Sequence, residues 1–147
     1  MKVEQKLQEL GLELPQAEAP GNVYLLTKKV GNLVYVAGRT SENKGILGKD
    51  VTMEEARLGA RSSILKSLAA LKEELGDLDR VKQFVQMIGF VRCADGCGDY
   101  PNAVDGATEL IQTLYGSDAL PVRMAVGAKE LPNGSVTEIM VVVEAED

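Results

Sequence analysis

The sequence LPVRMAVGAKELPNGSVTEIMVVVEAED, residues 120–147, carries the strongest indication of the fold. Two apolar runs flank the tripeptide Pro-Asn-Gly at 132–134, and an Asn-Gly pair between such runs is typical of a β-hairpin. We therefore predict that the chain ends in two paired antiparallel strands. Arg123 lies inside the first run and Glu138 near the start of the second, so charged groups occupy strands that otherwise suit a core.

Upstream, capping and periodicity predict the remaining elements. Thr52 and Glu55 form a capping box, and apolar side chains recur at helical spacing through residues 53–75, so a long helix is expected there. Residues 81–93 carry Val, Ile and Phe on both faces, which is typical of a strand covered on both sides. The expected order is a helix over 2–10, a hairpin of 23–30 and 33–38, the helix over 53–75, the strand over 81–93, a helix over about 102–115 and the closing hairpin.

This order predicts an α+β domain in which both long helices cover one face of a mixed sheet. No linker divides the chain, so residues 1–147 are expected to form a single domain, with residues 1–20 as an N-terminal helix and an extended connector. The opposite face of the sheet is too apolar to remain in water, since large exposed apolar patches mark interfaces. We therefore expect the chain to form an oligomer through that face.

Composition argues against several classes of function. The net charge of −6 disfavours a nucleic-acid partner, because proteins that bind nucleic acids usually present a basic surface. The sequence contains no histidine, which removes histidine acid–base catalysis, Ser-His-Asp triads and Cys/His zinc sites. No apolar run approaches the ~18 residues of a membrane span, and no signal peptide is recognisable. A cytoplasmic protein without a membrane partner is expected.

Cys93 and Cys97 are the two cysteines of the chain and lie four residues apart. Two thiolates are too few for a closed metal site, which usually needs four ligands. We interpret them as free thiols in a reducing compartment. Neither a metal nor a cofactor is expected.

Arg123 is the first candidate for chemistry. Because side chains alternate along a strand, Arg123, Ala125 and Gly127 share one face, and the small residues leave room beside the guanidinium. The planar fork of the guanidinium suits a carboxylate or a phosphate. The alternative is an edge-strand arginine or a structural ion pair, for example with Glu138.

Glu138 and Asp105 are the candidate acids. With Arg123 nearby, Glu138 could order a water molecule or act as a general base; alternatively it is a solvated acid at a strand end. Asp105 lies near the start of the second long helix, where the helix dipole alone would favour an acid.

Several of these residues recur at a distinctive spacing. Tyr24 lies seven residues before Gly31-Asn32, and VYVAG ends at Gly38. Pro121-x-Arg123 is followed by Leu131-Pro132 eight residues beyond the arginine, and Glu138 lies six residues beyond that proline. In this pattern, which covers most of the chain after about residue 20, the sequence resembles the Rid family. These are reactive intermediate deaminases, also called YjgF-like proteins and formerly described as endoribonucleases or translation inhibitors.

The resemblance implies a chorismate-mutase-like fold that assembles as a homotrimer, with ligand pockets in the clefts between subunits. In deaminating members the arginine that matches Arg123 holds the substrate carboxylate. A glutamate at the position of Glu138 orients the water that attacks an imine carbon, which releases ammonia and a keto acid. Tyr24 would line the pocket, and the backbone near Gly38 would face the ligand. No cofactor is implied.

The chain departs from the family pattern at four positions that the resemblance places at the ligand. Ala125 stands where deaminases commonly have a cysteine, and Ala37 where a serine is common. Arg39 replaces a usual glutamine, and Asp105 an asparagine-like position. The chain thus looks closer to a distinct, less characterised subgroup. Three hypotheses remain open: imine or enamine deamination, non-catalytic binding of small carboxylates as a sensor or partner, and the older endoribonuclease description.

Overall fold

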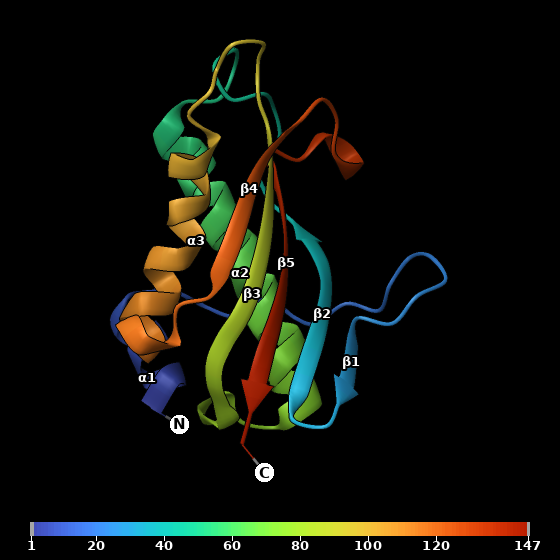
Figure 1. The fold of residues 1–147 in the computed structure, drawn as a ribbon, viewed down its shortest axis with the longest axis vertical. Helices are drawn as coiled ribbons and strands as arrows, with labels where there is room; N and C mark the ends of the chain where they lie inside the picture. The colour runs from blue at the N-terminus through green and yellow to red at the C-terminus, as the bar shows by residue number, and fades with distance from the viewer. Residues whose placement is uncertain (1, 147) are drawn as a thin grey trace.

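The computed structural model describes residues 2–146, in which helices pack against one face of a five-stranded sheet (Figure 1). The helices are α1 (Lys2–Glu9), α2 (Met53–Leu75) and α3 (Tyr100–Tyr115), with 3₁₀ turns η1 (Leu78–Arg80), η2 (Ser117–Ala119) and η3 (Pro132–Gly134). The strands are β1 (Thr27–Val30), β2 (Leu33–Thr40), β3 (Val81–Arg92), β4 (Val122–Ala128) and β5 (Thr137–Ala145). The predicted α+β class and the position of both long helices on one face are confirmed.

The predicted closing hairpin is wrong. The strands lie in the order β1-β2-β5-β3-β4, so β3 separates β4 from β5. The connection from β4 to β5 does turn at the Asn-Gly pair, where Asn133 and Gly134 have φ of 59° and 72°. However, eight residues separate the two strands, which is long enough for them to diverge. β4 instead pairs in parallel with β3, and α3 supplies the crossover that a parallel pair needs.

The first hairpin is confirmed, although it is shorter than predicted. β1 and β2 pair from Thr27↔Val36 to Val30↔Leu33 around a turn that includes Gly31 at φ 59°. The predicted strand residues 23–26 lie outside β1, and Val23 is fully exposed. The segment that contains Tyr24 is therefore a loop leading into the sheet.

The capping box of α2 forms as predicted. The hydroxyl of Thr52 accepts a hydrogen bond from the backbone N–H of Glu55 at 3.1 Å, and the Glu55 carboxylate accepts one from the backbone N–H of Thr52 at 3.0 Å. The apolar stripe of α2 then packs on the sheet, with Ile64 and Leu68 fully buried. Gly106 of α3 faces this helix so closely that an added Cβ would lie 2.1 Å from the carbonyl oxygen of Arg57. The two long helices therefore meet backbone to backbone.

The other face of the sheet is open in the single chain. We predicted that β3 is covered on both sides, but Phe90 remains 36% exposed. Further exposed apolar side chains lie on neighbouring strands at positions that share this face, and we call this set the open face: Tyr35, Phe90, Val122, Met124 and Met140. Nothing within residues 2–146 covers these side chains.

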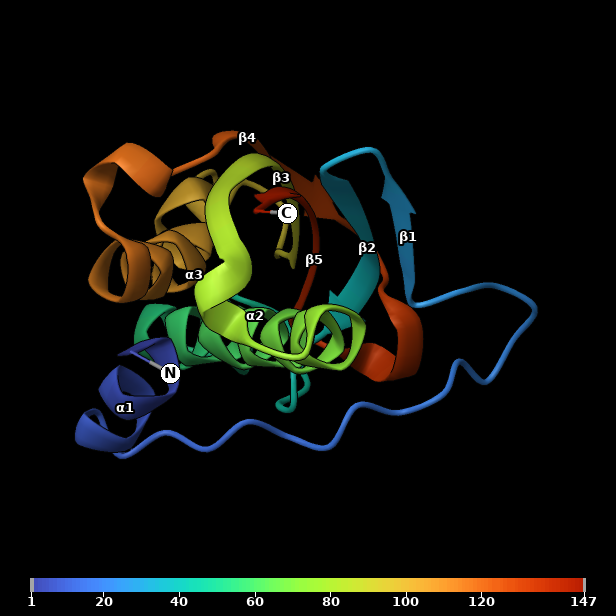
Figure 2. The ribbon, with the colours of Figure 1, turned by 90° about the horizontal axis from the view of Figure 1, so that it is seen from below.

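The N-terminal segment crosses the molecule on the helix side. Figure 2 shows the segment after α1 running along α2 before it turns up into β1. Leu14, Pro15 and Ala17 line a hollow together with Ala69 and Glu73 of α2. Along this path, residues 18–22 reach the C-terminal end of β2, where they border the candidate site.

The helices of residues 2–146 include none with the length and the apolar character of a membrane span.

Cys93 and Cys97 are not free thiols, which corrects the prediction. They are joined in a disulfide, with their Cα atoms 6.0 Å apart. The turn after β3 brings them together, because the backbone N–H of Cys97 donates to the carbonyl of Ala94 at 3.0 Å. That separation lies within the usual range for a disulfide.

Candidate functional site

A hollow of about 530 Å³ opens between the connector, the end of β2, η3 and the start of β5. Five of the residues predicted from the sequence to form the site lie together in it: Tyr24, Ala37, Gly38, Arg39 and Glu138. Its remaining lining is Glu18, Ala19, Pro20, Gly21, Asn22, Thr40, Pro132 and Asn133. We call this hollow the Glu138 pocket. The connector residues 18–22 were not predicted to reach this pocket, because no local pattern in them points to it.

A β-bulge shapes the Glu138 pocket. Val36 pairs with Val141 and Arg39 pairs with Ile139, so two residues of β2, Ala37 and Gly38, lie opposite a single residue of β5. Bulges of this kind bend a strand and change the direction of its side chains, and they are frequent beside active sites. Here the bulge lies directly beside the carboxylate-bearing part of β5.

Gly38 allows the Glu138 carboxylate to lie against the bulge. A Cβ added at Gly38 would meet Oε2 of Glu138 at 2.9 Å, closer than real Cβ contacts allow. Glycine at this position therefore has a local physical reason. Any larger residue would force the carboxylate to move.

Glu138 is the acid of the pocket whose pKa is shifted. Burial raises the pKa of Glu138, and the positive charge of Arg39 partly offsets this by lowering it. Within residues 2–146 the carboxylate accepts no hydrogen bond from another side chain or from the backbone. Its oxygens are thus available to a water molecule or a ligand, which is the arrangement a general base requires.

Arg39 is the cation of the same pocket. Its Nε is buried without a hydrogen-bond partner, and the guanidinium forms no ion pair with any described residue. A buried N–H group without a partner is costly, so such groups in folded proteins usually have one. The Glu138 pocket thus presents a cation that its own chain does not satisfy.

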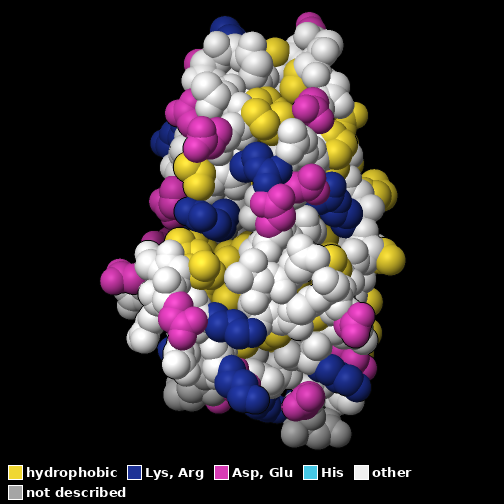
Figure 3. All heavy atoms as spheres, turned by 90° about the vertical axis from the view of Figure 1, so that its left-hand side faces the viewer, with side chains coloured by type: hydrophobic (Ala, Val, Ile, Leu, Met, Phe, Trp, Pro, Cys, Tyr) yellow, Lys and Arg dark blue, Asp and Glu magenta, His cyan; other side chains and the backbone are white. Residues whose placement is uncertain are grey.

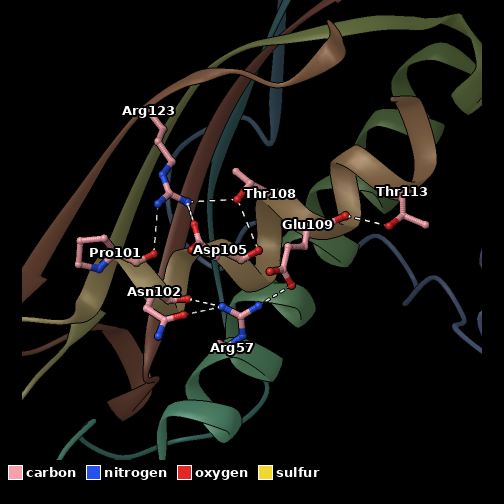
Figure 4. Close-up of polar contacts among 8 residues, drawn as sticks. All are labelled: Arg57, Pro101, Asn102, Asp105, Thr108, Glu109, Thr113 and Arg123. Carbon is pink, nitrogen blue, oxygen red and sulfur yellow. Dashed lines mark hydrogen bonds and ion pairs between the residues drawn. The ribbon is translucent and has the colours of Figure 1, made fainter. Parts of the chain in front are cut away.

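Arg123 lies elsewhere. Its Nη1 donates to the Asp105 carboxylate at 2.8 Å and to the Thr108 hydroxyl at 3.1 Å, and its Nη2 donates to the Pro101 carbonyl at 3.2 Å (Figure 4). All three partners belong to α3. The predicted alternation along β4 is confirmed, since Gly127 approaches Tyr100 of the same helix and Ala125 packs against the core. The space beside the small residues is filled by α3.

Arg123 and Glu138 do not approach each other within the chain, so the ion pair considered between them is absent. Arg123 is opposite Met87 on β3, and Glu138 is opposite Phe90, three residues further along. The two side chains also lie on opposite faces of the sheet. Arg123 contacts α3, whereas Thr137, the neighbour of Glu138, faces α2 through a 2.9 Å hydrogen bond to Ser63. Glu138 therefore faces the open side.

Asp105 binds Arg123 and does not line the Glu138 pocket of its own chain. Pro101, Asp105 and Thr108 are four and three residues apart, so they occupy one stripe of α3. That spacing was visible in the sequence and could have indicated a shared partner. A second cation, Arg57 of α2, binds the neighbouring stripe through Asn102 and Glu109 (Figure 4). Together these hydrogen bonds and ion pairs connect α3 with β4 and with α2.

Charges of both signs are interspersed on the surface around these contacts. Figure 3 shows the side of the molecule that carries α3, where basic side chains lie beside acidic ones and form no continuous basic stripe. Within the part of the chain that is described, no group of three or more Cys, Asp or Glu residues is placed to hold a metal ion.

A mixed sheet with helices on one face and an acidic pocket at a bulge of its open face defines a class of small α+β proteins. Sequence comparison identifies the class. The model of the family described as "YjgF/chorismate mutase-like, putative endoribonuclease" matches residues 4–145. The chain therefore belongs to the YjgF/chorismate mutase-like family, in agreement with the Rid-like pattern of its sequence.

Individual relatives support this assignment. Protein TCP17 of Trypanosoma cruzi is 33% identical over 150 residues, which cover 97% of this chain and 94% of that protein. A solved structure from Shewanella oneidensis, described as a "putative endoribonuclease", superposes with a TM-score of 0.93 at 28% identity and covers 98% of this chain and 99% of its own. The protein Atu1372 of Agrobacterium tumefaciens gives 0.91 at 31% identity, covering 98% of this chain and 92% of its own. The YjgF gene product of E. coli shares the fold, with a TM-score of 0.64 at 22% identity and coverage of 89% and 94%.

Proposed function

We propose that the protein is a hydrolase that converts small 2-imino or enamine acids into 2-oxo acids and ammonia. The observation that carries the proposal is Glu138, a carboxylate without a hydrogen-bond partner among the described residues, in a pocket with a free cation. Because burial raises its pKa, this carboxylate is a better proton acceptor than an exposed glutamate. That property suits the activation of a water molecule.

The proposed chemistry needs little besides position. The substrate reacts as the protonated imine: Glu138 accepts a proton from water as the water oxygen forms a bond to the imine carbon, and the C=N electron pair moves to the nitrogen, which becomes the amine of a carbinolamine. Glu138 passes this proton to the nitrogen and then takes the carbinolamine hydroxyl proton as the C–N bond breaks, which gives the carbonyl and ammonia. Glu138 finally gives up that proton to the solvent. Imines hydrolyse in water unaided, so holding water and substrate together supplies much of the acceleration. Glu138 and a group that holds the substrate suffice, and neither histidine nor a cofactor takes part.

The proposed site is completed by a second copy of the chain. The open face carries large exposed apolar side chains, and Glu138 lies on this face opposite Phe90. Association through an apolar face would bring a neighbour to the mouth of the Glu138 pocket and exclude water from it. We propose a homotrimer with its pockets between subunits. Two arginines are candidates for the substrate carboxylate: Arg39 within the pocket, and Arg123 from the neighbouring subunit.

A second function has one observation in its favour. Ala37 gives the pocket no hydroxyl where deaminases of the family commonly have a serine, which suits a trimer that binds small carboxylates without reaction. The endoribonuclease description of the relatives is less well supported for this chain. Its net charge of −6 gives little attraction for RNA, and it has no histidine to act as acid and base.

Ammonia release from 2-imino acids, generated in the assay by an amino-acid oxidase, tests the proposal. We expect acceleration by the wild type and a loss of roughly 100-fold or more in Glu138→Gln, since a positioned base contributes about 10²–10⁴-fold. Glu144→Gln is the matched control, because Glu144 lies on the same strand, at an alternate position, outside the pocket. If Glu138→Gln binds 2-oxobutanoate as the wild type does and neither releases ammonia, the binding function is correct.

A further inference from the structure

We propose that the Cys93–Cys97 disulfide is a redox switch that controls how firmly the start of α3 holds Arg123. A dithiol reductant opens the disulfide, and the first turn of α3 then loses the constraint that fixes it. For its effect on ligand binding, the proposal rests on the proposed function, in which Arg123 is a candidate for the substrate carboxylate. Its effect on α3 can be measured without any ligand.

Cys93 is held in place at the end of the sheet. Its backbone N–H donates to the carbonyl of Ala128, the last residue of β4, at 3.4 Å. On the other side, Leu47 hydrogen-bonds through its N–H and its carbonyl to the residues before and after Cys93, at 2.8 and 2.9 Å. Cys93 therefore keeps its position whether or not it is bonded to Cys97.

Cys97 lies in the glycine-rich turn between β3 and α3, at the top of Figure 1. Its N–H donates to the carbonyl of Ala94 at 3.0 Å and its carbonyl accepts from the N–H of Asp99 at 2.8 Å, so these hydrogen bonds stay within the turn. Glycine at positions 96 and 98, on either side of Cys97, gives the turn the freedom to rearrange. The disulfide is therefore the covalent link that fixes this turn to the end of β3.

The start of α3 depends on this turn. Asp99 occupies the N-cap position, but its side chain forms no capping hydrogen bond, in contrast to Thr52 at the start of α2. A helix without such a cap has first-turn N–H groups that no side chain satisfies, and its start is less stable. Since residues 98 and 99 alone separate Cys97 from α3, a constraint on Cys97 also constrains the first turn.

The first turn of α3 in turn positions Arg123. The carbonyl of Pro101 accepts a hydrogen bond from Nη2 at 3.2 Å, whereas Asp105 and Thr108, one and two turns further along, bind Nη1 (Figure 4). When the first turn loosens, the guanidinium loses the contact that fixes its second nitrogen. An arginine that is already ordered loses less conformational entropy when it binds a carboxylate. The oxidised protein should therefore bind a carboxylate ligand more tightly than the reduced protein.

The disulfide borders a hollow at the surface. Cys93 and Cys97 are both partly exposed, and they line a hollow of about 660 Å³ together with Lys49, Lys129 and Asp95. None of the open-face residues lines this hollow, so association through the open face does not by itself cover it. Neighbouring lysines favour the thiolate form of a cysteine, which is the leaving group in thiol–disulfide exchange. A dithiol thus has both access and a favourable electrostatic environment.

The exchange is a two-electron reaction. A thiolate of the dithiol attacks one sulfur atom of the disulfide, the S–S bond breaks, and the displaced cysteine leaves as a thiolate. The second thiol of the reductant then displaces the other cysteine. The reductant ends as a disulfide, and its two protons pass to Cys93 and Cys97. Because the two cysteines are four residues apart, they stay close enough for a disulfide oxidant to reverse both steps.

Titration calorimetry with 2-oxobutanoate tests the switch on air-oxidised wild type, on wild type reduced with dithiothreitol and on the double variant Cys93→Ser/Cys97→Ser. We expect the oxidised protein to bind about 3- to 10-fold more tightly than the reduced one, the range for the loss of one hydrogen bond. The double variant should bind like the reduced protein with or without dithiothreitol. Amide hydrogen exchange over residues 99–104 should be faster in the reduced protein and in the variant, and exchange over residues 60–70 of α2 should stay unchanged.

Equal exchange over residues 99–104 in the two redox forms would overturn the proposal, and so would equal affinity of two forms that both bind. A disulfide that dithiothreitol leaves intact in the folded protein, as counted by thiol titration, would overturn it too. If neither form binds 2-oxobutanoate, the ligand of the proposed function is wrong, and the exchange measurement alone decides on the switch. Ammonia release by the oxidised protein tests the proposed function separately.

Discussion

At the scale of single residues, the Glu138 pocket combines groups that a purely structural site would avoid. A half-buried carboxylate and a cation with an unsatisfied nitrogen lie together without a direct ion pair. Such groups cost stability, and proteins usually retain them where function requires them. The stability that each of these groups costs the fold can therefore be measured by substituting one residue at a time.

Glu138→Gln should stabilise the protein above neutral pH. Because the folded-state pKa of Glu138 is raised, the stability tied to this group is present at pH below its unfolded-state pKa and is lost as pH rises through the folded-state value. The amide removes that loss. Melting temperatures measured from pH 4 to pH 8 should show an advantage of the variant that grows with pH. An advantage that is equal at all pH values would argue against burial as the cause.

Gly38→Ala should reduce activity by about 10-fold or more while the fold is retained. The added Cβ meets the far end of the Glu138 side chain at 2.9 Å, and a flexible carboxylate can move away. A displacement of about 1 Å at a reacting group is enough for such a loss. Gly127→Ala is the matched control, because its added Cβ would meet Tyr100 only at 3.4 Å and Gly127 lies outside the Glu138 pocket. Equal activity of the two variants would show that the position of the Glu138 carboxylate is unimportant.

At the scale of elements, the sequence predicted what depends on local signals and missed what depends on strand pairing. The capping box and apolar stripe of α2 are local, and both are confirmed. The pairing of β4 with β3 depends on α3 as a crossover, which no turn signal at Asn133 reveals. The expectation that Arg123 lies near Glu138 also fails within the chain, because β3 separates the two strands that carry them. The residues of β2 and β5 that the family pattern singled out line one hollow, because the bulge of β2 lies beside Glu138 of β5.

The contact of α2 with α3 depends on Gly106. Gly106→Ala should cost roughly 1–3 kcal/mol, the usual effect of overpacking, because the Cβ would lie 2.1 Å from a backbone oxygen that cannot rotate away. Denaturant unfolding measures this cost. Thr113→Ala on the exposed side of the same helix is the control and should be neutral or slightly stabilising. Equal stability of both variants would show that the helices can separate freely.

At the scale of the whole molecule, the open face is the largest feature that the single chain leaves unexplained. Met124→Glu places a charge on this face, opposite the side that carries Arg123. We expect the mass in sedimentation equilibrium to fall toward the 15.8 kDa of one chain, because a buried unpaired charge is costly. Gln112→Glu on the exposed side of α3 should leave the mass unchanged. A variant with the wild-type mass would exclude this face as the interface.

The pH dependence of ammonia release from a 2-imino acid tests the central claim most directly. The account predicts acceleration over the uncatalysed reaction, with kcat/KM falling on the acidic side through a pKa above that of an ordinary glutamate, because burial raises the pKa of Glu138. Glu138→Gln should abolish both the acceleration and this acidic limb, and Arg39→Gln should move the limb to higher pH. A wild type that does not accelerate the reaction, or a Glu138→Gln variant with the same rate and profile, would contradict it.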